Sequence, residues 1–290
     1  MKNTLLGSLY LSLAASIWGG MYVVVKHVVD FVPPLELVWI RYVIAIFALL
    51  IIGVVTKQSW RIEKRDFLLI FMIGLIGNTI SIITQEVGTM LSTAQMGAII
   101  TSTTPAFIVL FARIILKEKI TFKKAISIIL ATIGVATIVG NADIDPSLQL
   151  GGVSLLIAAL TWALMSVLIK RIPRQYSQIV VTFYTTVVAI VLLTPITISR
   201  LPELDVQAMM DPSIWGGLLY LGIVSTACAF LLWNRGLRMV NASSGGLFFF
   251  FQPIVGTFLG WLLLGEQIGL SFWIGTILIF IGVLLVIREQ

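Results

Sequence analysis

The sequence contains very little of the chemistry on which most metal centres and hydrolytic sites depend. Its 290 residues include one cysteine, Cys228, and one histidine, His27. A single cysteine excludes an intramolecular disulfide, and there is no His/Cys cluster to hold a metal. The chain also has no G-x-S-x-G, P-loop or G-x-G-x-x-G motif. We therefore expect no metal, no cofactor and no catalytic residue.

Charged residues are also scarce. Asp, Glu, Lys and Arg make up 11% of the chain, whereas a soluble domain carries about 25%. Hydrophobic residues make up 59%, which is more apolar surface than soluble folding can bury. The formal net charge of +6 does not indicate a nucleic-acid partner, because the basic residues lie in short loops between apolar segments. Such loops contact membrane lipids, and we expect an integral membrane protein.

Ten apolar segments have a length near the 20 residues or so that a membrane-spanning helix needs. The predicted fold class is therefore all-α, with ten transmembrane helices and short connections. The segments are Leu5–Val25, Leu35–Val55, Phe67–Gln85, Ala94–Leu116, Phe122–Gly140, Gly152–Ile169, Ile179–Ile198, Ile214–Asn234, Ala242–Leu264 and Leu270–Ile287.

The basic residues are distributed unequally between the two sides of this arrangement. With the N-terminus in the cytoplasm, most Lys and Arg residues fall in inside loops, and the outside loops hold only Lys26 and Arg200. The positive-inside rule then places both termini in the cytoplasm. We expect a multi-pass protein of the cell inner (plasma) membrane. The first segment has features of a signal peptide, but its length and the nine spans after it favour a retained helix.

The chain contains an internal repeat. With an offset of 148, Gly74 coincides with Gly222 and Pro105 with Pro253, and residues 18–26 match residues 162–170 with an offset of 144. The repeats occupy residues 1–140 and 152–290, joined by an outside linker at 141–151. Five spans per repeat is an odd number, so the second repeat is predicted to be inverted. Inverted repeats around a central cavity are typical of alternating-access transporters.

One face of the third span is small or polar, at spacings of 4, 3 and 4: Gly74, Asn78, Ser81 and Gln85. The matching face of the eighth span carries Thr226 and Trp233, with Asn234 adjacent. Polar groups at membrane depth face a cavity or another helix. Close helix packing stays an alternative, but packing alone does not need both an Asn and a Gln on one face.

Aromatic residues hold matching positions in the first and sixth spans. Trp18 and Tyr22 lie one helical turn apart, and their counterparts are Trp162 and Ser166. The helical rise places Trp18 past the midplane and short of the outer interface. We interpret these positions as cavity lining that contacts a solute or closes the pathway, with interface anchoring as the alternative.

The fourth and ninth spans each contain a proline, Pro105 or Pro253. Proline removes a backbone hydrogen bond and kinks a helix. Small residues precede each proline, and Gln95 among them is a candidate cavity residue. We predict a pair of kinked helices that move during transport, with ordinary packing as the alternative.

Two charged residues are candidates for recognising an anion or forming a gate. Arg41 lies about seven residues into the second span, within predicted reach of Glu36 or the outer head groups. Glu86 follows the polar face of the third span, where a solvated helix end is the favoured interpretation. On that basis no carboxylate lies at mid-membrane, and proton coupling is not indicated.

These landmarks resemble the EamA branch of the drug/metabolite transporter superfamily. The resemblance rests on Ala15–Gly20 followed by Lys26, on Arg41-Tyr42, and on the modules Pro105…Glu118 and Pro253…Glu266. It implies ten helices in two inverted repeats, a cavity lined by helices 1, 3, 4, 6, 8 and 9, and export of amino acids, other metabolites or toxic cations. The second repeat departs from the first, because no basic residue accompanies Tyr184.

The sequence thus predicts an exporter of a small organic solute, most plausibly an amino acid or related metabolite. A proton-coupled exporter of toxic organic cations or drugs is the alternative, and a membrane-embedded enzyme is a remote one. The expected partners are a small-molecule solute and membrane lipids. We expect the functional unit to be a monomer, with a dimer as the alternative.

Overall fold

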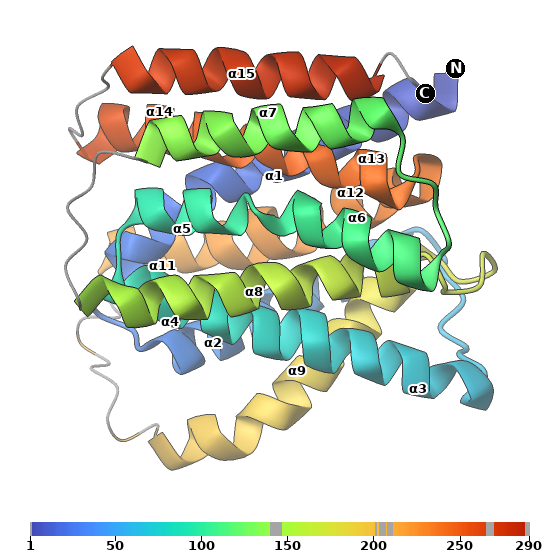
Figure 1. The fold of residues 1–290 in the computed structure, drawn as a ribbon. Coiled ribbons are helices and arrows are strands. Elements are labelled where there is room, and N and C mark those ends of the chain that lie inside the picture. Colours follow the sequence, from blue (N-terminus) through green and yellow to red (C-terminus); the bar gives the residue numbers. More distant parts are fainter. Residues whose placement is uncertain are drawn as a thin grey trace.

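The computed structural model describes residues 2–139, 147–200, 202, 207, 211–264 and 270–287. Within these residues the chain forms helices and short connections, and no strand. Most of the helices lie side by side in one bundle (Figure 1). Seven helices in the described part are long and apolar enough to cross a membrane. The protein is therefore an all-helical membrane bundle, while the count of ten spans and the inversion of the repeats stay predictions.

The regular α-helical structure of the first half is interrupted at two places. A π-helix, η1, lies inside the third helical run, and the chain leaves the helix at Ser102 and Thr103, just before Pro105. Pro105 then lies in the first turn of α6, where its missing N–H costs no hydrogen bond. The elements are α1 (Lys2–Val28), α2 (Pro34–Val55), α3 (Lys64–Ile73), η1 (Gly74–Ser81), α4 (Ile82–Leu91), α5 (Ala94–Thr101), α6 (Thr104–Ile115) and α7 (Phe122–Val139).

The second half repeats this local pattern. Its π-helix, η3, falls on η1 when the sequence is shifted by 148, and a 3₁₀ turn, η4, precedes the α-helix that contains Pro253. The elements are α8 (Ser147–Ile169), α9 (Gln178–Arg200), α11 (Pro212–Leu219), η3 (Tyr220–Cys228), α12 (Ala229–Met239), α13 (Ala242–Gly246), η4 (Leu247–Phe250), α14 (Phe251–Leu264) and α15 (Leu270–Ile287).

The two halves contact each other reciprocally. The π-helix of each half packs against the second long helix of the other half, η1 against α9 and η3 against α2. Glycine permits both contacts, since an added Cβ on Gly74 would lie 2.8 Å from the Thr185 carbonyl oxygen. On Gly222 it would lie 2.9 Å from the carbonyl oxygen of Arg41. This close approach holds the Arg41 backbone beside η3 in the interior of the bundle.

Candidate functional site

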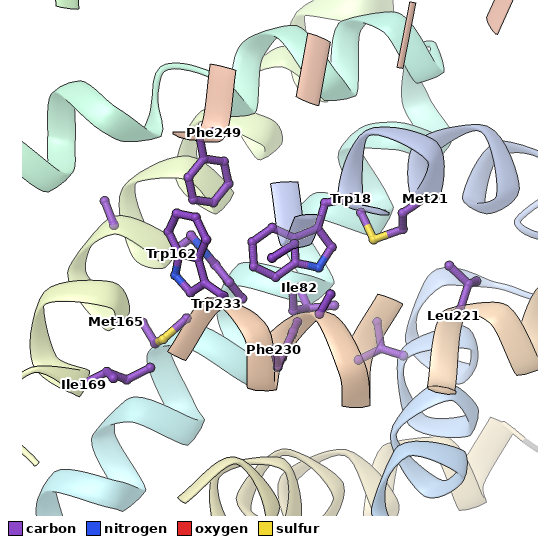
Figure 2. Packing of buried hydrophobic residues seen from close by; sticks show 14 of the residues in the cluster. Trp18, Met21, Ile82, Trp162, Met165, Ile169, Leu221, Phe230, Trp233 and Phe249 are labelled. Atoms are coloured by element: carbon purple, nitrogen blue, oxygen red, sulfur yellow. The ribbon is translucent and has the colours of Figure 1, made fainter. Parts of the chain in front are cut away.

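Five aromatic side chains fill the centre of the bundle, and we call them the aromatic plug: Trp18, Trp162, Phe230, Trp233 and Phe249. The ring of Trp18 contacts all four of the others, with centroid separations of 5.1 Å to Trp162, 5.3 Å to Trp233, 5.6 Å to Phe249 and 5.9 Å to Phe230. Figure 2 shows these rings converging from different helices. Such edge and stacked contacts between rings are favourable.

The aromatic plug leaves little open space. The cavity beside it has a volume of about 20 Å³ for the centre of a water-sized molecule, room for about one water. The predicted central cavity is thus closed to an organic solute in this conformation.

The side chains that line this central cavity come largely in repeat-related pairs. The first half contributes a residue from each of four helical positions, and the second half contributes its equivalent at the offset of 144 or 148. The pairs are Trp18 with Trp162, Ile82 with Phe230, Thr101 with Phe249, and Thr104 with Gln252. The centre is therefore the place where the two repeats meet.

The three indole N–H groups of the plug differ in their partners. Trp18 Nε1 donates to the Ser225 carbonyl oxygen at 2.9 Å, and Trp233 Nε1 donates to Ser166 Oγ at 3.2 Å. Trp162 Nε1 is buried and has no acceptor among the described residues. A buried donor without an acceptor is costly, so Trp162 offers an unused hydrogen bond beside the central cavity.

A buried ion pair lies next to the plug. Arg41 Nη1 donates to Glu86 Oε1, and both side chains are 0% exposed. Arg41 Nε also donates to Thr226 Oγ1 at 3.0 Å, and Nη2 donates to Ser225 Oγ at 3.2 Å. Both hydroxyls belong to η3, so this one guanidinium connects three helical runs. Glu86 Oε2 has no partner among the described residues.

The predicted environment of Glu86 is wrong. The third span was expected to end at Gln85, but α4 continues to Leu91 and places Glu86 inside the helix. The expected pairing of Arg41 with Glu36 or the outer head groups is also wrong, since Arg41 is fully buried and pairs with Glu86. The physical reason is that burial of Arg41 against η3 leaves a carboxylate from α4 as its nearest counter-charge.

A separate chain of polar contacts lies beside the ion pair and reaches both proline-containing runs. Tyr22 Oη donates to Gln85 Oε1 at 3.3 Å and lies 2.7 Å from Thr101 Oγ1. Thr101 Oγ1 lies 3.4 Å from Gln252 Oε1. Gln85, Thr101 and Gln252 all line the central cavity. The chain connects α1 and α4 with both proline-containing runs.

The polar face predicted in the third span is divided between the cavity and neighbouring helices. Only Gln85 lines the central cavity. Asn78 Nδ2 donates to Thr186 Oγ1 at 3.4 Å, and Ser81 Oγ donates to the Ala158 carbonyl oxygen at 2.9 Å. On the other half, Asn234 Nδ2 donates to Thr182 Oγ1 at 3.0 Å. The π-helix changes the rotation per residue, so a stripe drawn at α-helical spacing no longer stays on one face.

The side chain of Gln95, a predicted cavity residue, lies outside what the structure describes. Other residues line the central cavity although the sequence did not predict them. The missed residues are Met21, Ile82, Thr101, Thr104, Ala158, Ala159, Phe230, Phe249 and Gln252. The repeat itself contained a usable signal: the offset of 144 relates Trp18 to Trp162, and the offset of 148 relates Ile82 to Phe230.

Lysine contacts at the two ends of the bundle are also repeat-related. Lys26 Nζ donates to the carbonyl oxygens of Ser92 at 2.8 Å and Met90 at 3.1 Å. Lys170, the equivalent of Lys26, donates from Nζ to the carbonyl oxygen of Val240, the equivalent of Ser92. Each lysine thus binds the carbonyl end of a helix in its own half. The Lys26 contact lies at one end of the bundle, and the Lys170 contact lies at the other.

A carboxylate reinforces the contact at the Lys170 end. Glu118 accepts hydrogen bonds from the backbone N–H groups of Ala242 at 3.0 Å and Ser243 at 3.2 Å, so it ties the first half to α13. Burial alone raises the pKa of Glu118. The hydrogen bonds from Ser243 and Ala242, together with the charge on Lys170, lower it below its usual value.

The bundle and its paired centre define a multi-pass membrane protein built from two similar halves. The EamA-like transporter family matches residues 5–140 and 149–288, and the chain belongs to this family. The family and its relatives point to a transporter rather than an enzyme.

Several proteins resemble the chain over part or all of its length. The permease-like protein YdzE of Bacillus subtilis is 78% identical over 72 residues, which cover 25% of this chain and 92% of YdzE. An uncharacterized transporter of Archaeoglobus fulgidus is 27% identical over 284 residues, covering 97% of this chain and 98% of that protein. A solved crystal structure has a TM-score of 0.77 at 17% identity and covers 96% of this chain and 95% of that one, which supports the fold.

Proposed function

We propose that this protein exports a small organic solute, an amino acid or related metabolite, by alternating access of its two repeats. The observation that carries the proposal is the pair of equivalent lysine contacts, Lys26 with Ser92 and Lys170 with Val240, on either side of the aromatic plug. Each contact joins two helices of the same half, so releasing one while keeping the other would let those two helices separate at one end of the bundle only. The membrane would be the cell inner membrane, with both termini in the cytoplasm and a monomer as the functional unit.

The chemistry of the centre supports a solute with both an apolar and a polar part. The rings of the plug offer an apolar surface, and Trp162 Nε1 offers a donor without an acceptor among the described residues. Gln85 and Arg41 also line the central cavity and supply further hydrogen-bonding groups. An amino acid combines an apolar side chain with a carboxylate that such donors recognise.

A proton-coupled exporter of organic cations is the second candidate. It is favoured by Glu86, whose carboxylate is buried with one oxygen unpartnered in the described residues. Release of Arg41 from Glu86 would leave a buried carboxylate that binds either a proton or a cation.

Counterflow into proteoliposomes tests both candidates. Purified protein is reconstituted and assayed with amino acids, nucleobases and quaternary amines. We expect exchange of at least one amino acid above empty liposomes. Exchange of quaternary amines alone, driven by an imposed pH gradient, would replace the first candidate with the second. No exchange of any solute would overturn both.

The alternation itself is tested by the variants Lys26→Met and Lys170→Met. Each removes the ammonium contact at one end of the bundle, and we expect exchange to fall several-fold in both. Lys123→Met is the matched control, since Lys123 is exposed and has no contact across the bundle among the described residues. Exchange equal to that of the control would show that the two contacts do not hold the ends closed.

A further inference from the structure

A second cavity lies at the end of the bundle where α1 begins and α15 ends, which we call the terminal end (right-hand side of Figure 1). Its volume is about 620 Å³, within the range of about 300–1,000 Å³ typical of small-molecule sites. It shares no lining residue with the central cavity. The start of α7 and the ends of α8 and α12 contribute to its wall.

The wall of this cavity is strongly basic. Four cationic side chains line it, Lys124, Lys170, Arg174 and Arg238, and no Asp or Glu occurs among its described lining residues. Burial lowers the pKa of the Lys170 ammonium below its usual value; the charge on Glu118 opposes this effect, and the charge on Lys124 adds to it. The charges of Lys124 and Lys170 thus repel each other, as do those of Arg174 and Arg238.

Lys124 is the most informative of the four. Its side chain lines the cavity although the residue is only 6% exposed, and within the described residues its ammonium has no hydrogen bond and no ion pair. The next residue along the chain, Lys123, is exposed. A charge that merely orients the protein in the membrane has no need of burial. The Lys124 ammonium opens into the cavity without a counter-charge among the described residues, and an anion bound there would supply one.

Two of the other cations are already held in position. Arg238 donates from Nη1 to the Tyr176 carbonyl oxygen at 3.1 Å and from Nη2 to that of Ile172 at 3.3 Å. Lys170 donates to the Val240 carbonyl oxygen. A guanidinium has five N–H donors and an ammonium has three, so both groups keep donors for a ligand. The cavity is therefore preorganised rather than assembled on binding.

We propose that the cavity at the terminal end is a binding site for a phosphate group, carried by a small phosphorylated metabolite or by an anionic lipid head group. Four cations without a lining carboxylate match a multiply charged oxyanion better than a single carboxylate. The bound group bridges the start of α7 and the ends of α8 and α12, so it holds the terminal end closed.

Phosphate-dependent stability tests this site in the full chain. The detergent-purified protein is unfolded thermally in sodium phosphate or sodium pyrophosphate and in sodium chloride of equal ionic strength. We expect the phosphate salts to raise the melting temperature. The apparent Kd should be about tenfold weaker in Lys124→Met, the effect of losing one charge-assisted hydrogen bond, and unchanged in Lys123→Met. Lys124→Arg should keep the affinity.

A second measurement separates the two sources of phosphate. The protein is placed in nanodiscs of phosphatidylcholine with or without phosphatidylglycerol. A melting temperature that rises with phosphatidylglycerol and depends on Lys124, without an effect of soluble phosphates, identifies a lipid head group; the reverse identifies a soluble metabolite.

Three outcomes would overturn the site. One is equal weakening by Lys123→Met and Lys124→Met, because the attraction would then be diffuse. Another is the absence of any effect beyond ionic strength in both detergent and nanodiscs. The third is a lower melting temperature of Lys124→Met in phosphate-free buffer, because relief of repulsion should leave it unchanged or raise it.

Discussion

At three positions near the centre of the bundle, the first half of the chain places a hydrogen-bonding or charged side chain where the second half places an aromatic ring or a hydroxyl. Gln85 corresponds to Trp233, and Thr101 corresponds to Phe249. Arg41 corresponds to Thr185, which donates only to the Thr182 carbonyl oxygen at 3.0 Å. The two halves therefore repeat each other in backbone and differ in the chemistry that they bring to the centre.

The features that the two halves share and the side chains in which they differ have separate consequences. The shared features, such as the π-helices and the glycines at 74 and 222, determine how the helices pack. Under the proposed function, the unshared side chains would determine what the centre binds. A symmetric lining would present the same groups twice, whereas here Gln85 and Thr101 are replaced by rings in the second half, and Trp18 and Gln252 keep a ring and an amide on both sides.

The largest expected effect of breaking this asymmetry is at Arg41. Replacing it with Ala leaves Glu86 buried without its counter-charge, which costs about 3–5 kcal/mol. The equivalent change Thr185→Ala should cost about 1 kcal/mol or less, because it removes one neutral hydrogen bond. Thermal unfolding in detergent measures both.

The double variant Arg41→Met with Glu86→Gln should recover much of the stability lost in Arg41→Ala. Both charges are then absent, so no unpaired charge is buried. Similar losses in Arg41→Ala and Thr185→Ala would contradict the asymmetry.

A smaller effect is expected from two indole N–H groups of the plug, those of Trp233 and Trp162. Trp233→Phe removes the hydrogen bond to Ser166 and should cost about 1 kcal/mol. Trp162→Phe removes a donor that has no acceptor in the described residues, so its stability loss should be smaller. If that donor binds solute, KM in counterflow should rise for Trp162→Phe.

The contradicting result is a Trp162→Phe variant that is as destabilised as Trp233→Phe and has an unchanged KM. Trp162 would then be a packing residue only.

The smallest expected effect distinguishes two amides of the third helical run. Gln85→Ala should lower exchange at nearly normal stability, because Gln85 lines the central cavity. Asn78→Ala should instead lower stability by about 1 kcal/mol, since its amide donates to Thr186 on α9. Counterflow normalised to folded protein, together with melting temperatures, tests the pair. A selective loss of exchange in Asn78→Ala would return Asn78 to the solute site.

Much of the centre was predictable because the repeat marks equivalent positions. Trp18, Trp162 and Gln85, predicted from spacing and depth, do line the central cavity. Asn78 and Ser81 point elsewhere, because a π-helix alters the rotation of that face and no residue-level signal in the sequence announces a π-helix. The burial of Glu86 was not predicted, because the predicted third span ends six residues before the end of α4. A carboxylate at the end of a helix is expected to be solvated.

By itself, the sequence determined that the protein lies in a lipid membrane, that it is helical and that it has two related halves. The first two follow from composition, and the third follows from residues repeated at offsets of 144 and 148. Only the tertiary structure decided which polar groups pair. The partnership of Arg41 with Glu86 and the closure of the centre by the aromatic plug depend on distances between helices far apart in the chain. Those distances are set by backbone packing at positions such as Gly222, and a pattern along one helix does not contain them.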